Sequence, residues 1–206
     1  MITLYTWSTP NGRKVSIALE ELALPYEVRP VDITSGEQRK PDFLKLNPNN
    51  KIPVIVDPDG PDGKPITVIE SGAILIYLAG KTGKLLPTDL RARLEAIQWL
   101  MFQMGSVGPM LGQAHHFLRF APELIPYALE RYSKEALRIY GVLNARLENR
   151  EWLAGGEYSI ADIATFPWIA RHDWQGIDLK RFPQVKRWFE AIGARPAVQR
   201  GMAVPQ

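Results

Sequence analysis

The segment Asn49-Asn50-Lys51-Ile52-Pro53-Val54, together with Glu70-Ser71-Gly72-Ala73-Ile74 downstream, decides the fold of this chain. Proline lacks the amide hydrogen that a central strand needs, so Pro53 is expected at the entrance of the apolar strand Val54-Ile55-Val56. An X-Pro bond can be cis at such an entrance. A cis bond between Ile52 and Pro53 would turn the backbone of Ile52 outward, toward a ligand.

The chain contains no cysteine. Disulfides, thiolate metal sites and a redox-active thiol that belongs to the protein are therefore excluded. The segments around Pro53 and Ser71 nevertheless suggest a fold that handles thiols. Any sulfur chemistry must then be supplied by a bound ligand.

The overall composition is that of an ordinary soluble globule. With 206 residues and a formal net charge of +3, the chain is long enough for one large domain or two small ones. Lys and Arg are interspersed with acidic residues, which argues against nucleic acid as a partner. The N-terminus begins with a strand-like run rather than a leader, and no apolar run approaches ~20 residues. We therefore expect a cytoplasmic protein that does not associate with membranes.

Short strands and helices alternate over the first part of the chain. The apolar pattern predicts strands at 2–6, 26–31, 54–56 and 66–69, and helices at 11–22, at 38–46 with an interruption near Pro41, and from Ser71 onward. The turn-rich loop 57–63 is suited to a hairpin between the last two strands. This order predicts an α/β domain of thioredoxin-like fold over residues 1–82.

The remainder is predicted to be an all-helical bundle domain over residues 89–206, joined to the first domain by a linker at 83–88. A glycine and a proline at the two ends of this linker stop one helix and precede the next. The helix that starts at Leu90 is expected to bend or break at Gly105, Gly108 and Pro109. The last helix is predicted over 184–194.

One helix start has a specific signature. Ser159-Ile160-Ala161-Asp162 has the spacing of a capping box, with Asp162 in place of the usual Glu or Gln. The pattern predicts that Ser159 caps the helix and that Asp162 reaches back to the Ser159 backbone.

These features resemble the cytosolic glutathione transferases over essentially the whole chain. The resemblance is carried by Lys51-Ile52-Pro53, by Glu70-Ser71 and by the capping box. Four further segments look like the bacterial Nu-class branch, which is related to yeast Ure2-type proteins: Ser8–Gly12, Pro48–Pro53, Gly108–Gln113 and Ile125–Ala128. The resemblance implies the glutathione transferase fold, α/β plus all-α, and a homodimer. Members of that branch are glutathione-dependent disulfide reductases with weak transferase activity.

Glutathione offers two carboxylates, an ammonium and a thiol, and the residues can be matched to them. Ser71 at a helix N-terminus can present its hydroxyl and backbone N–H groups to the γ-glutamyl carboxylate, while Glu70 can pair with the ammonium. The alternative is that Ser71 is only a helix N-cap. Ile52 before a cis-Pro53 would present its N–H and C=O groups to the tripeptide backbone, as an added strand does.

Gln38 and Lys51 are candidates for the glycine carboxylate; the alternative is that each is an ordinary solvated side chain. Arg131 matches an arginine that Nu-class proteins use near a second glutathione, and its alternative is a solvated helix charge. The adjacent His115 and His116 point about 100° apart on a helix, so a shared metal ion is not expected.

The reaction centre is expected at the start of the first helix. A free thiol has a pKa of about 8.5, and donors at a helix N-terminus lower it. The Thr9 hydroxyl and the Asn11 side chain or N–H are therefore assigned to the glutathione thiolate, with Pro10 in the first helical position. Thr9 and Asn11 also have a purely structural interpretation as cap and turn residues. Ser8 and Tyr5 are the runners-up.

The function predicted from the sequence is a glutathione-dependent disulfide-bond oxidoreductase that uses the thiolate of bound glutathione. Two alternatives remain open. The first is a transferase that conjugates glutathione to small electrophiles. The second is a non-enzymatic glutathione-binding or regulatory protein of the same fold. A two-fold homodimer is also expected because the helix that carries Met101, Phe102 and Met104 exposes apolar surface.

Overall fold

The computed structural model describes residues 1–154 and 156–205. The chain divides into two compact units, which are described separately here. Residues Met1–Lys84 and the segment from Arg195 onward form the first unit, and Leu85–Ala194 form the second. The linker at 83–88 and the domain limits drawn from the sequence remain a prediction. Within the described residues, no helix combines the length and the apolar character needed to cross a bilayer.

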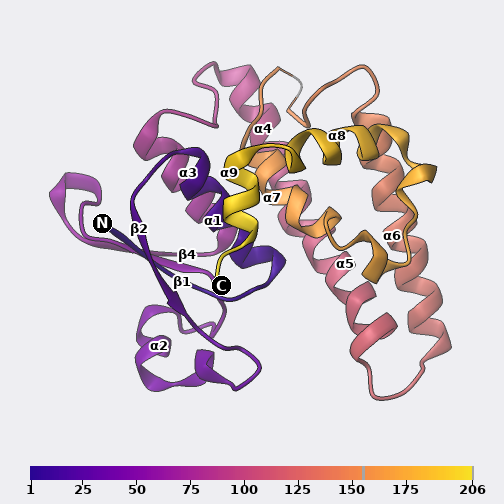
Figure 1. The fold of residues 1–206 in the computed structure, drawn as a ribbon, viewed down its shortest axis with the longest axis horizontal. Coiled ribbons are helices and arrows are strands. Elements are labelled where there is room, and N and C mark those ends of the chain that lie inside the picture. Colours follow the sequence, from indigo (N-terminus) through magenta and orange to yellow (C-terminus); the bar gives the residue numbers. More distant parts are fainter. Residues whose placement is uncertain (155, 206) are drawn as a thin grey trace. The chain divides into compact units, whose positions relative to one another are not determined.

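The first unit is built on a mixed sheet with the strand order β2-β1-β3-β4 (Figure 1). Its elements, in chain order, are β1 (Ile2–Thr6), α1 (Pro10–Glu21), β2 (Tyr26–Pro30), a 3₁₀ turn (Glu37–Arg39), α2 (Pro41–Leu46), β3 (Val54–Asp57), a 3₁₀ turn (Pro61–Gly63), β4 (Ile66–Ile69) and α3 (Ser71–Thr82). β1 is parallel to β2 and antiparallel to β3, and β3 is antiparallel to β4. This topology confirms the predicted thioredoxin-like fold.

Apolar residues at strand and helix spacing form the core of this unit. Leu4 pairs with Ile55 across the sheet, and both side chains are fully buried. α1 and α3 pack on one another and bury their apolar faces, including Val15, Ile17 and Ile74. The strand and helix periodicities of the sequence thus explain both the sheet and the pair of helices α1 and α3.

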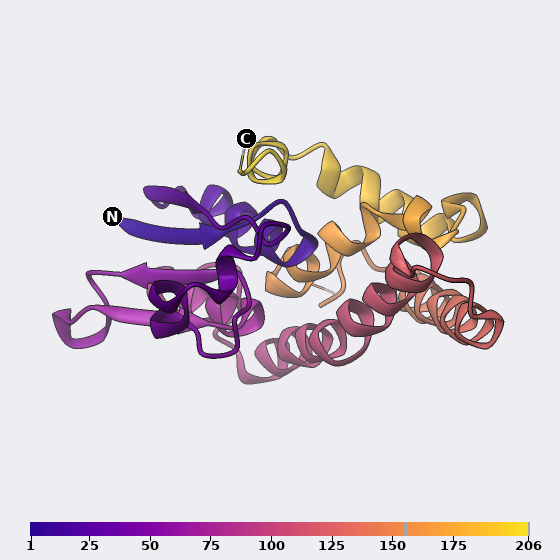
Figure 2. The same ribbon diagram turned by 90° about the horizontal axis from the view of Figure 1, so that it is seen from below.

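A further helix, α9 (Pro196–Met202), packs on α1 (Figures 1 and 2). The Ser16 hydroxyl donates to the Gly201 carbonyl at 2.6 Å, and a Cβ at Gly201 would lie 2.5 Å from Ile17 Cα. Arg195 forms an ion pair with Glu21 at 2.6 Å. The prediction that the helix at 184–194 is the last one is wrong. The seven residues of α9 are too few for a periodic pattern to identify it.

The second unit is helical. Its elements are α4 (Leu90–Phe102), a π turn (Gln103–Val107), α5 (Gly108–His115), a second π turn (His116–Phe120), α6 (Pro126–Arg146), α7 (Ile160–Ile169), two 3₁₀ turns (His172–Gln175 and Leu179–Arg181) and α8 (Pro183–Gly193). Near Gly105, where a bend or a break is predicted, the helix does not break, because it widens into the π turn and continues as α5. Pro109 has no N–H to donate, and a Cβ at Gly108 would lie 3.0 Å from Gln103 Nε2, so the local sequence favours this wider turn.

The predicted capping box is confirmed at the start of α7. Ser159 accepts from Ala161 N at 3.2 Å, and Asp162 accepts from Ser159 N at 3.0 Å. Asp162 is fully buried and also accepts from Leu153 N at 2.9 Å and from Trp188 Nε1 at 2.8 Å. One carboxylate therefore ties the α7 start, the preceding loop and α8 together.

Candidate functional site

Three segments of the first unit meet at one end of its sheet, where β1 and β4 end and β3 begins. Tyr5 of β1 pairs with Val54 of β3, and Val54 pairs with Ile69 of β4. Because β3 is antiparallel to both neighbours, the end of β1, the beginning of β3 and the end of β4 lie in one row. The segments that follow or precede these strand ends are Trp7–Asn11, Lys51–Pro53 and Glu70–Ser71. The structure thus brings Thr9, Asn11, Ile52 and Ser71 to the same end of the sheet.

The loop before β3 has the predicted geometry at its proline. The Ile52-Pro53 bond is cis, and Val54 begins the strand directly after it. The buried Asn47 fixes this loop, because its side-chain amide donates to the Lys51 carbonyl at 2.7 Å and its oxygen accepts from Asn49 N at 2.9 Å. Sequence reasoning missed Asn47, although an Asn before a Pro-Asn-Asn turn is the usual signal for such a loop.

The start of α3 differs from the simple capping alternative. Glu70, not Ser71, is the N-cap, and its side chain makes no capping bond with the described residues. Its backbone has φ +65° and ψ 116°, a conformation that costs a residue other than glycine on the order of 1–3 kcal/mol and that is found mainly at functional sites. Ser71 is the first helical residue, and its buried hydroxyl accepts a hydrogen bond from Lys14 Nζ at 3.2 Å. The interpretation of Ser71 as an N-cap is therefore wrong.

The start of α1 is held close to the end of β1. Thr9 is the N-cap and accepts from Gly12 N at 3.2 Å, while Pro10 occupies the first helical position as predicted. A Cβ at position 12 would lie 2.3 Å from Thr6 Oγ1 and 2.4 Å from the Trp7 carbonyl, so only glycine fits. Asn11 follows in the first turn and is partly exposed. The Thr9 oxygen accepts the capping bond, which leaves its hydroxyl proton for another acceptor.

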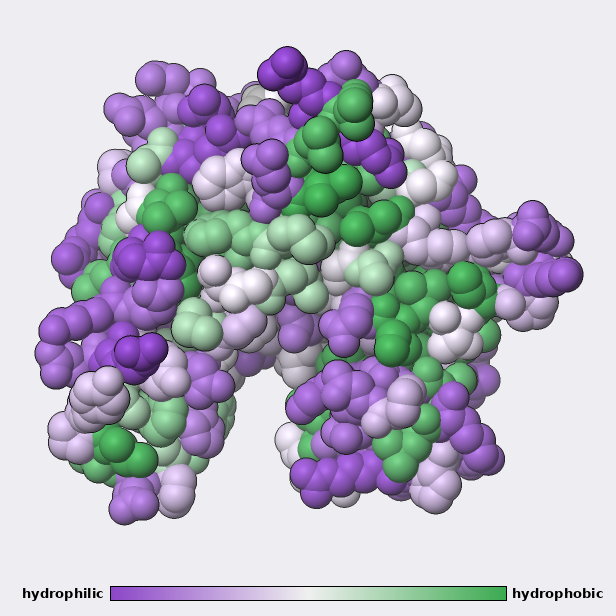
Figure 3. All heavy atoms as spheres, turned by 180° about the vertical axis from the view of Figure 1, so that it is seen from behind, coloured by the Kyte–Doolittle hydropathy of each residue, from purple (hydrophilic) through white to green (hydrophobic). Residues whose placement is uncertain are grey.

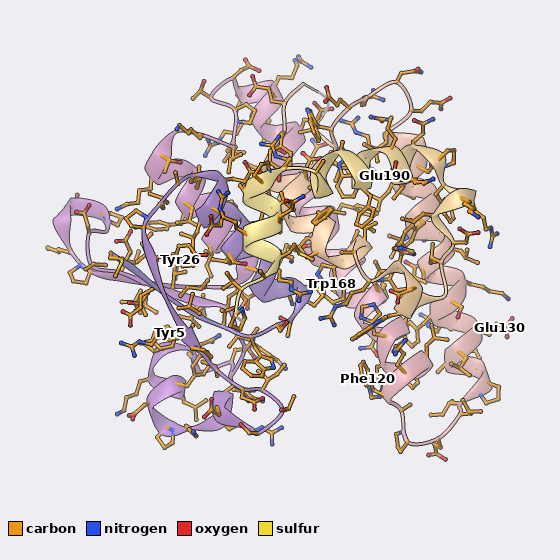
Figure 4. The ribbon with its side chains drawn as sticks, in the orientation of Figure 1. Tyr5, Tyr26, Phe120, Glu130, Trp168 and Glu190 are labelled. Atoms are coloured by element: carbon orange, nitrogen blue, oxygen red, sulfur yellow. The ribbon has the colours of Figure 1, made fainter. Side chains whose placement is uncertain are left out.

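Both runners-up for the reaction centre have structural roles. Ser8 Oγ accepts from the Arg13 guanidinium at 3.0 Å. Tyr5 lies on β1 (Figure 4), and its ring meets Phe43 edge to face at 6.4 Å between centroids. Tyr5 is half-buried rather than fully buried.

The two candidates for the glycine carboxylate are less constrained. Lys51 is exposed. Gln38 donates to the Ile33 carbonyl at 3.4 Å, while its buried Oε1 makes no hydrogen bond with any residue that the structure describes. An open acceptor suits an N–H group of a ligand better than a carboxylate.

Three other candidates belong to the second unit. Arg131 is exposed on α6 and lines a surface pocket of about 560 Å³ with other charged and aromatic side chains, including Tyr127, Glu130 and Arg138. His116 is exposed, whereas His115 is buried, with its Nε2 2.9 Å from Gln175 Nε2. Among the described residues there is no group of three or more His, Cys, Asp or Glu side chains suited to a metal ion.

Burial is the main cause that lowers the pKa of His115 to about 4, and the nearby Arg171 adds to it. The ring is therefore neutral at pH 7 and accepts the bond from Gln175. Gln175 also donates to the Trp168 carbonyl at 2.8 Å and accepts from Tyr140 at 2.6 Å. This network holds the core of the second unit together.

Lys14 is the main residue that sequence reasoning missed. It lies on α1 and is only 1% exposed. Its ammonium group donates to the hydroxyl of Ser71 at the start of α3. Burial lowers its pKa to about 7, against the opposing effect of the nearby Glu70. The sequence does indicate that Lys14 is buried, because it stands one helical turn before Ala18 on the apolar face of the helix.

Comparisons with known proteins match both halves of the chain. Residues 9–81 match the glutathione S-transferase N-terminal domain, and residues 113–196 match the glutathione S-transferase C-terminal domain. Disulfide-bond oxidoreductase YfcG from Escherichia coli is 52% identical over 207 residues, covering 100% of this chain and 96% of the relative. Disulfide-bond oxidoreductase YghU from the same organism is 39% identical over 216 residues, covering 98% and 74%.

Solved structures agree with these matches. A glutathione transferase from Burkholderia graminis, with two glutathione molecules bound per subunit, has a TM-score of 0.95 and 52% identity, covering 100% of this chain and 88% of that one. A glutathione transferase from Pseudomonas putida, with one glutathione disulfide bound per subunit, has a TM-score of 0.94 and 45% identity, covering 100% and 92%.

Proposed function

This chain belongs to the glutathione S-transferase family, and on that premise we propose that it is a glutathione-dependent disulfide-bond oxidoreductase. The observation that carries the proposal is the absence of cysteine from a chain whose sheet edge gathers the cis-proline loop and two helix N-termini. The reactive thiol therefore comes from bound glutathione. Relatives named as disulfide-bond oxidoreductases support this choice over simple conjugation.

In the proposed complex the tripeptide lies along the sheet edge. Ser71 and the N–H groups of α3 receive the γ-glutamyl carboxylate, and Glu70 receives the ammonium. The backbone of Ile52 pairs with the peptide as an added strand does, next to Pro53. Lys51 and Gln38 receive the glycine end. Solved relatives that hold glutathione or its disulfide support glutathione as the ligand, in the role of a co-substrate.

The proposed reaction exchanges thiols and disulfides. Thr9 and Asn11, at the positive end of α1, stabilise the glutathione thiolate. That thiolate attacks one sulfur of a disulfide substrate, which forms a mixed disulfide and releases one substrate thiolate. A second glutathione thiolate then attacks the mixed disulfide, releasing the second substrate thiolate and forming glutathione disulfide. Two electrons pass from two glutathiones to the substrate, and the protein supplies binding and orientation. We also assign Arg131 to the second glutathione.

An activity comparison tests the proposed function. With glutathione and hydroxyethyl disulfide, the protein should turn over well, and with chlorodinitrobenzene it should turn over weakly. Activity should survive treatment with a thiol alkylator that is then removed, because the chain has no thiol to block. Dominant conjugation would favour the transferase alternative. No turnover with either substrate would favour the non-enzymatic one.

A second prediction concerns the γ-glutamyl head. Ser71→Ala and Glu70→Gln should each weaken glutathione binding by at least about tenfold, because each removes a bond to a charged group of the ligand. Calorimetric titration measures this, with the exposed Glu123→Gln in the second unit as a matched control. Unchanged affinity in both variants would leave the site without its main contacts.

A third prediction is a homodimer. Leu90, Leu94 and Met101 of α4 recur at helical spacing and are 69%, 48% and 47% exposed. Figure 3 shows hydrophobic residues as green spheres among hydrophilic ones in purple, on the face opposite to that of Figure 1. Sedimentation should give twice the 23.3 kDa of one chain. Leu94→Asp should yield monomers, whereas Leu124→Asp, at a more exposed leucine outside α4, should not. A monomeric parent protein at micromolar concentration would contradict the proposal.

A further inference from the structure

Lys14 of α1 contacts the proposed site through Ser71 at the start of α3. It projects from α1 toward the start of α3, where its ammonium nitrogen is 3.2 Å from Ser71 Oγ. Lys14 and Ser71 are 1% and 4% exposed. A lysine is seldom buried to this degree in a protein interior, because removing its charge from water is costly. Lys14 bears this cost next to the N-terminus of α3, where the proposed function places the ligand carboxylate.

The charge state of Lys14 limits what the Ser71 hydroxyl can do in this contact. A charged ammonium has three donors and no acceptor, so in this contact Ser71 must accept. The hydroxyl proton of Ser71 is then directed elsewhere. A neutral amine has a lone pair and can accept that proton, in which case Ser71 has nothing left to donate to a ligand.

We propose that Lys14 is a positioning residue whose charged form makes the Ser71 hydroxyl a donor to the ligand carboxylate, so that binding is coupled to proton uptake by Lys14. The inference rests on the proposed function, because it assumes that the γ-glutamyl carboxylate binds at Ser71. Lys14 does not itself touch the ligand in this arrangement. Its effect passes through the hydroxyl.

The electrostatic surroundings support this coupling. Burial lowers the pKa of Lys14 to about 7, and the Glu70 carboxylate on α3 is the charge that opposes this shift. On the α9 side, Arg195 and Arg200 are paired with Glu21 and Glu20 of α1. Arg13, the neighbouring cation on α1, donates to Ser8. A ligand carboxylate accepting from Ser71 would favour the ammonium and raise the pKa of Lys14.

The sign of the pH dependence follows. Below pH 7 Lys14 is already charged, so binding requires no proton. Above pH 7 the free protein has lost this proton and must regain it to bind. Affinity should therefore fall as pH rises through the pKa of the free protein. In the absence of ligand the trend in stability is opposite. The unfolded chain, with a lysine pKa near 10.5, binds more protons than the folded one, so the folding penalty present below pH 7 is relieved between pH 7 and 10.5.

S-methylglutathione is a suitable probe, because it keeps the γ-glutamyl head but has no thiol to ionise. Titration calorimetry in phosphate and in Tris, which differ in ionisation enthalpy, gives the number of protons taken up on binding. For the parent protein we expect the uptake of about one proton per site at pH 8, and an affinity about tenfold weaker at pH 8.5 than at pH 6.5.

Three variants assign the proton. Lys14→Met should take up fewer protons than the parent and lose the extra pH dependence. Its ligand-free stability should also lack the rise above pH 7. Ser71→Ala retains Lys14 but removes the hydroxyl that links it to the ligand, so proton uptake on binding should fall in this variant as well. This variant keeps the test valid if Lys14→Met does not fold. Exposed Lys64→Met is the matched control and should behave as the parent protein does.

The outcomes separate the two proposals. If the parent protein binds S-methylglutathione with the same proton uptake as Ser71→Ala or Lys14→Met, the role of Lys14 is wrong and the glutathione site stands. If the parent protein does not bind S-methylglutathione at all, the proposed function is wrong and the role of Lys14 falls with it.

Discussion

Asn11→Ala is expected to lower turnover with glutathione and hydroxyethyl disulfide by about 100-fold, the usual cost of removing one donor aimed at developing negative charge. Glutathione affinity should change by less than about threefold, because the proposed bond strengthens only when sulfur carries charge. Thr9→Ala should lower turnover less and also reduce stability, since Thr9 caps α1 through the bond to Gly12.

The pH profile of kcat/KM separates a catalytic effect from a structural one. A weaker thiolate site should move the acidic limb of the profile toward the pKa of free glutathione. Asn49→Ala, at an exposed position of the loop before β3, is the matched control and should leave the limb in place. If Thr9→Ala and Asn11→Ala both retain the parent turnover and profile, the reaction centre is misassigned, and Ser8 and Tyr5 become the residues to test.

Asp162→Ala should destabilise the second unit by about 4 kcal/mol, because the buried donors on Leu153, Ser159 and Trp188 would lose their acceptor together. Urea unfolding followed by tryptophan fluorescence measures the loss. Asp89→Ala is a useful contrast. Asp89 also caps a helix, through Ala92 N at 2.9 Å, but it is exposed, and its loss should cost about 1 kcal/mol.

A second variant tests whether the carboxylate, rather than the volume of the side chain, is responsible. Asp162→Asn keeps the shape and one acceptor oxygen but turns an NH₂ group toward a donor, so an intermediate loss is expected. A loss below about 1 kcal/mol for Asp162→Ala would mean that the capping network contributes little beyond an ordinary exposed cap.

The sequence predicted the parts of this protein that depend on local pattern. The alternation of Ile2–Thr6 and the stripe on α1 predict the first strand and the first helix, and the missing amide hydrogen of Pro53 places it at the entrance of β3. The capping box at Ser159 is equally local. Each of these features is decided by residues within a few positions of one another.

The features that the sequence did not predict depend on contacts between distant residues. The position of Lys14 on the apolar face of α1 indicates burial, but its contact with Ser71, 57 positions away, depends on the packing of α3. The N-cap of α3 is Glu70 rather than Ser71. The Glu70 backbone has a positive φ, which the conformational preference of glutamate does not predict. The π turn Gln103–Val107 packs against α7, and a Cβ at the following Gly108 would lie 3.6 Å from Trp168 Cε2.

The docking of α9 on α1 has a consequence for the order in which the protein is made. The Ser16 hydroxyl bond, the close approach of Gly201 to Ile17 and the ion pair of Arg195 with Glu21 all join the first helix to a segment translated more than 170 residues later. On the ribosome this side of α1 therefore stays uncovered until α9 has emerged. A ribosome stalled before α9 is complete should expose α1 to limited proteolysis, whereas release of the finished chain should protect it.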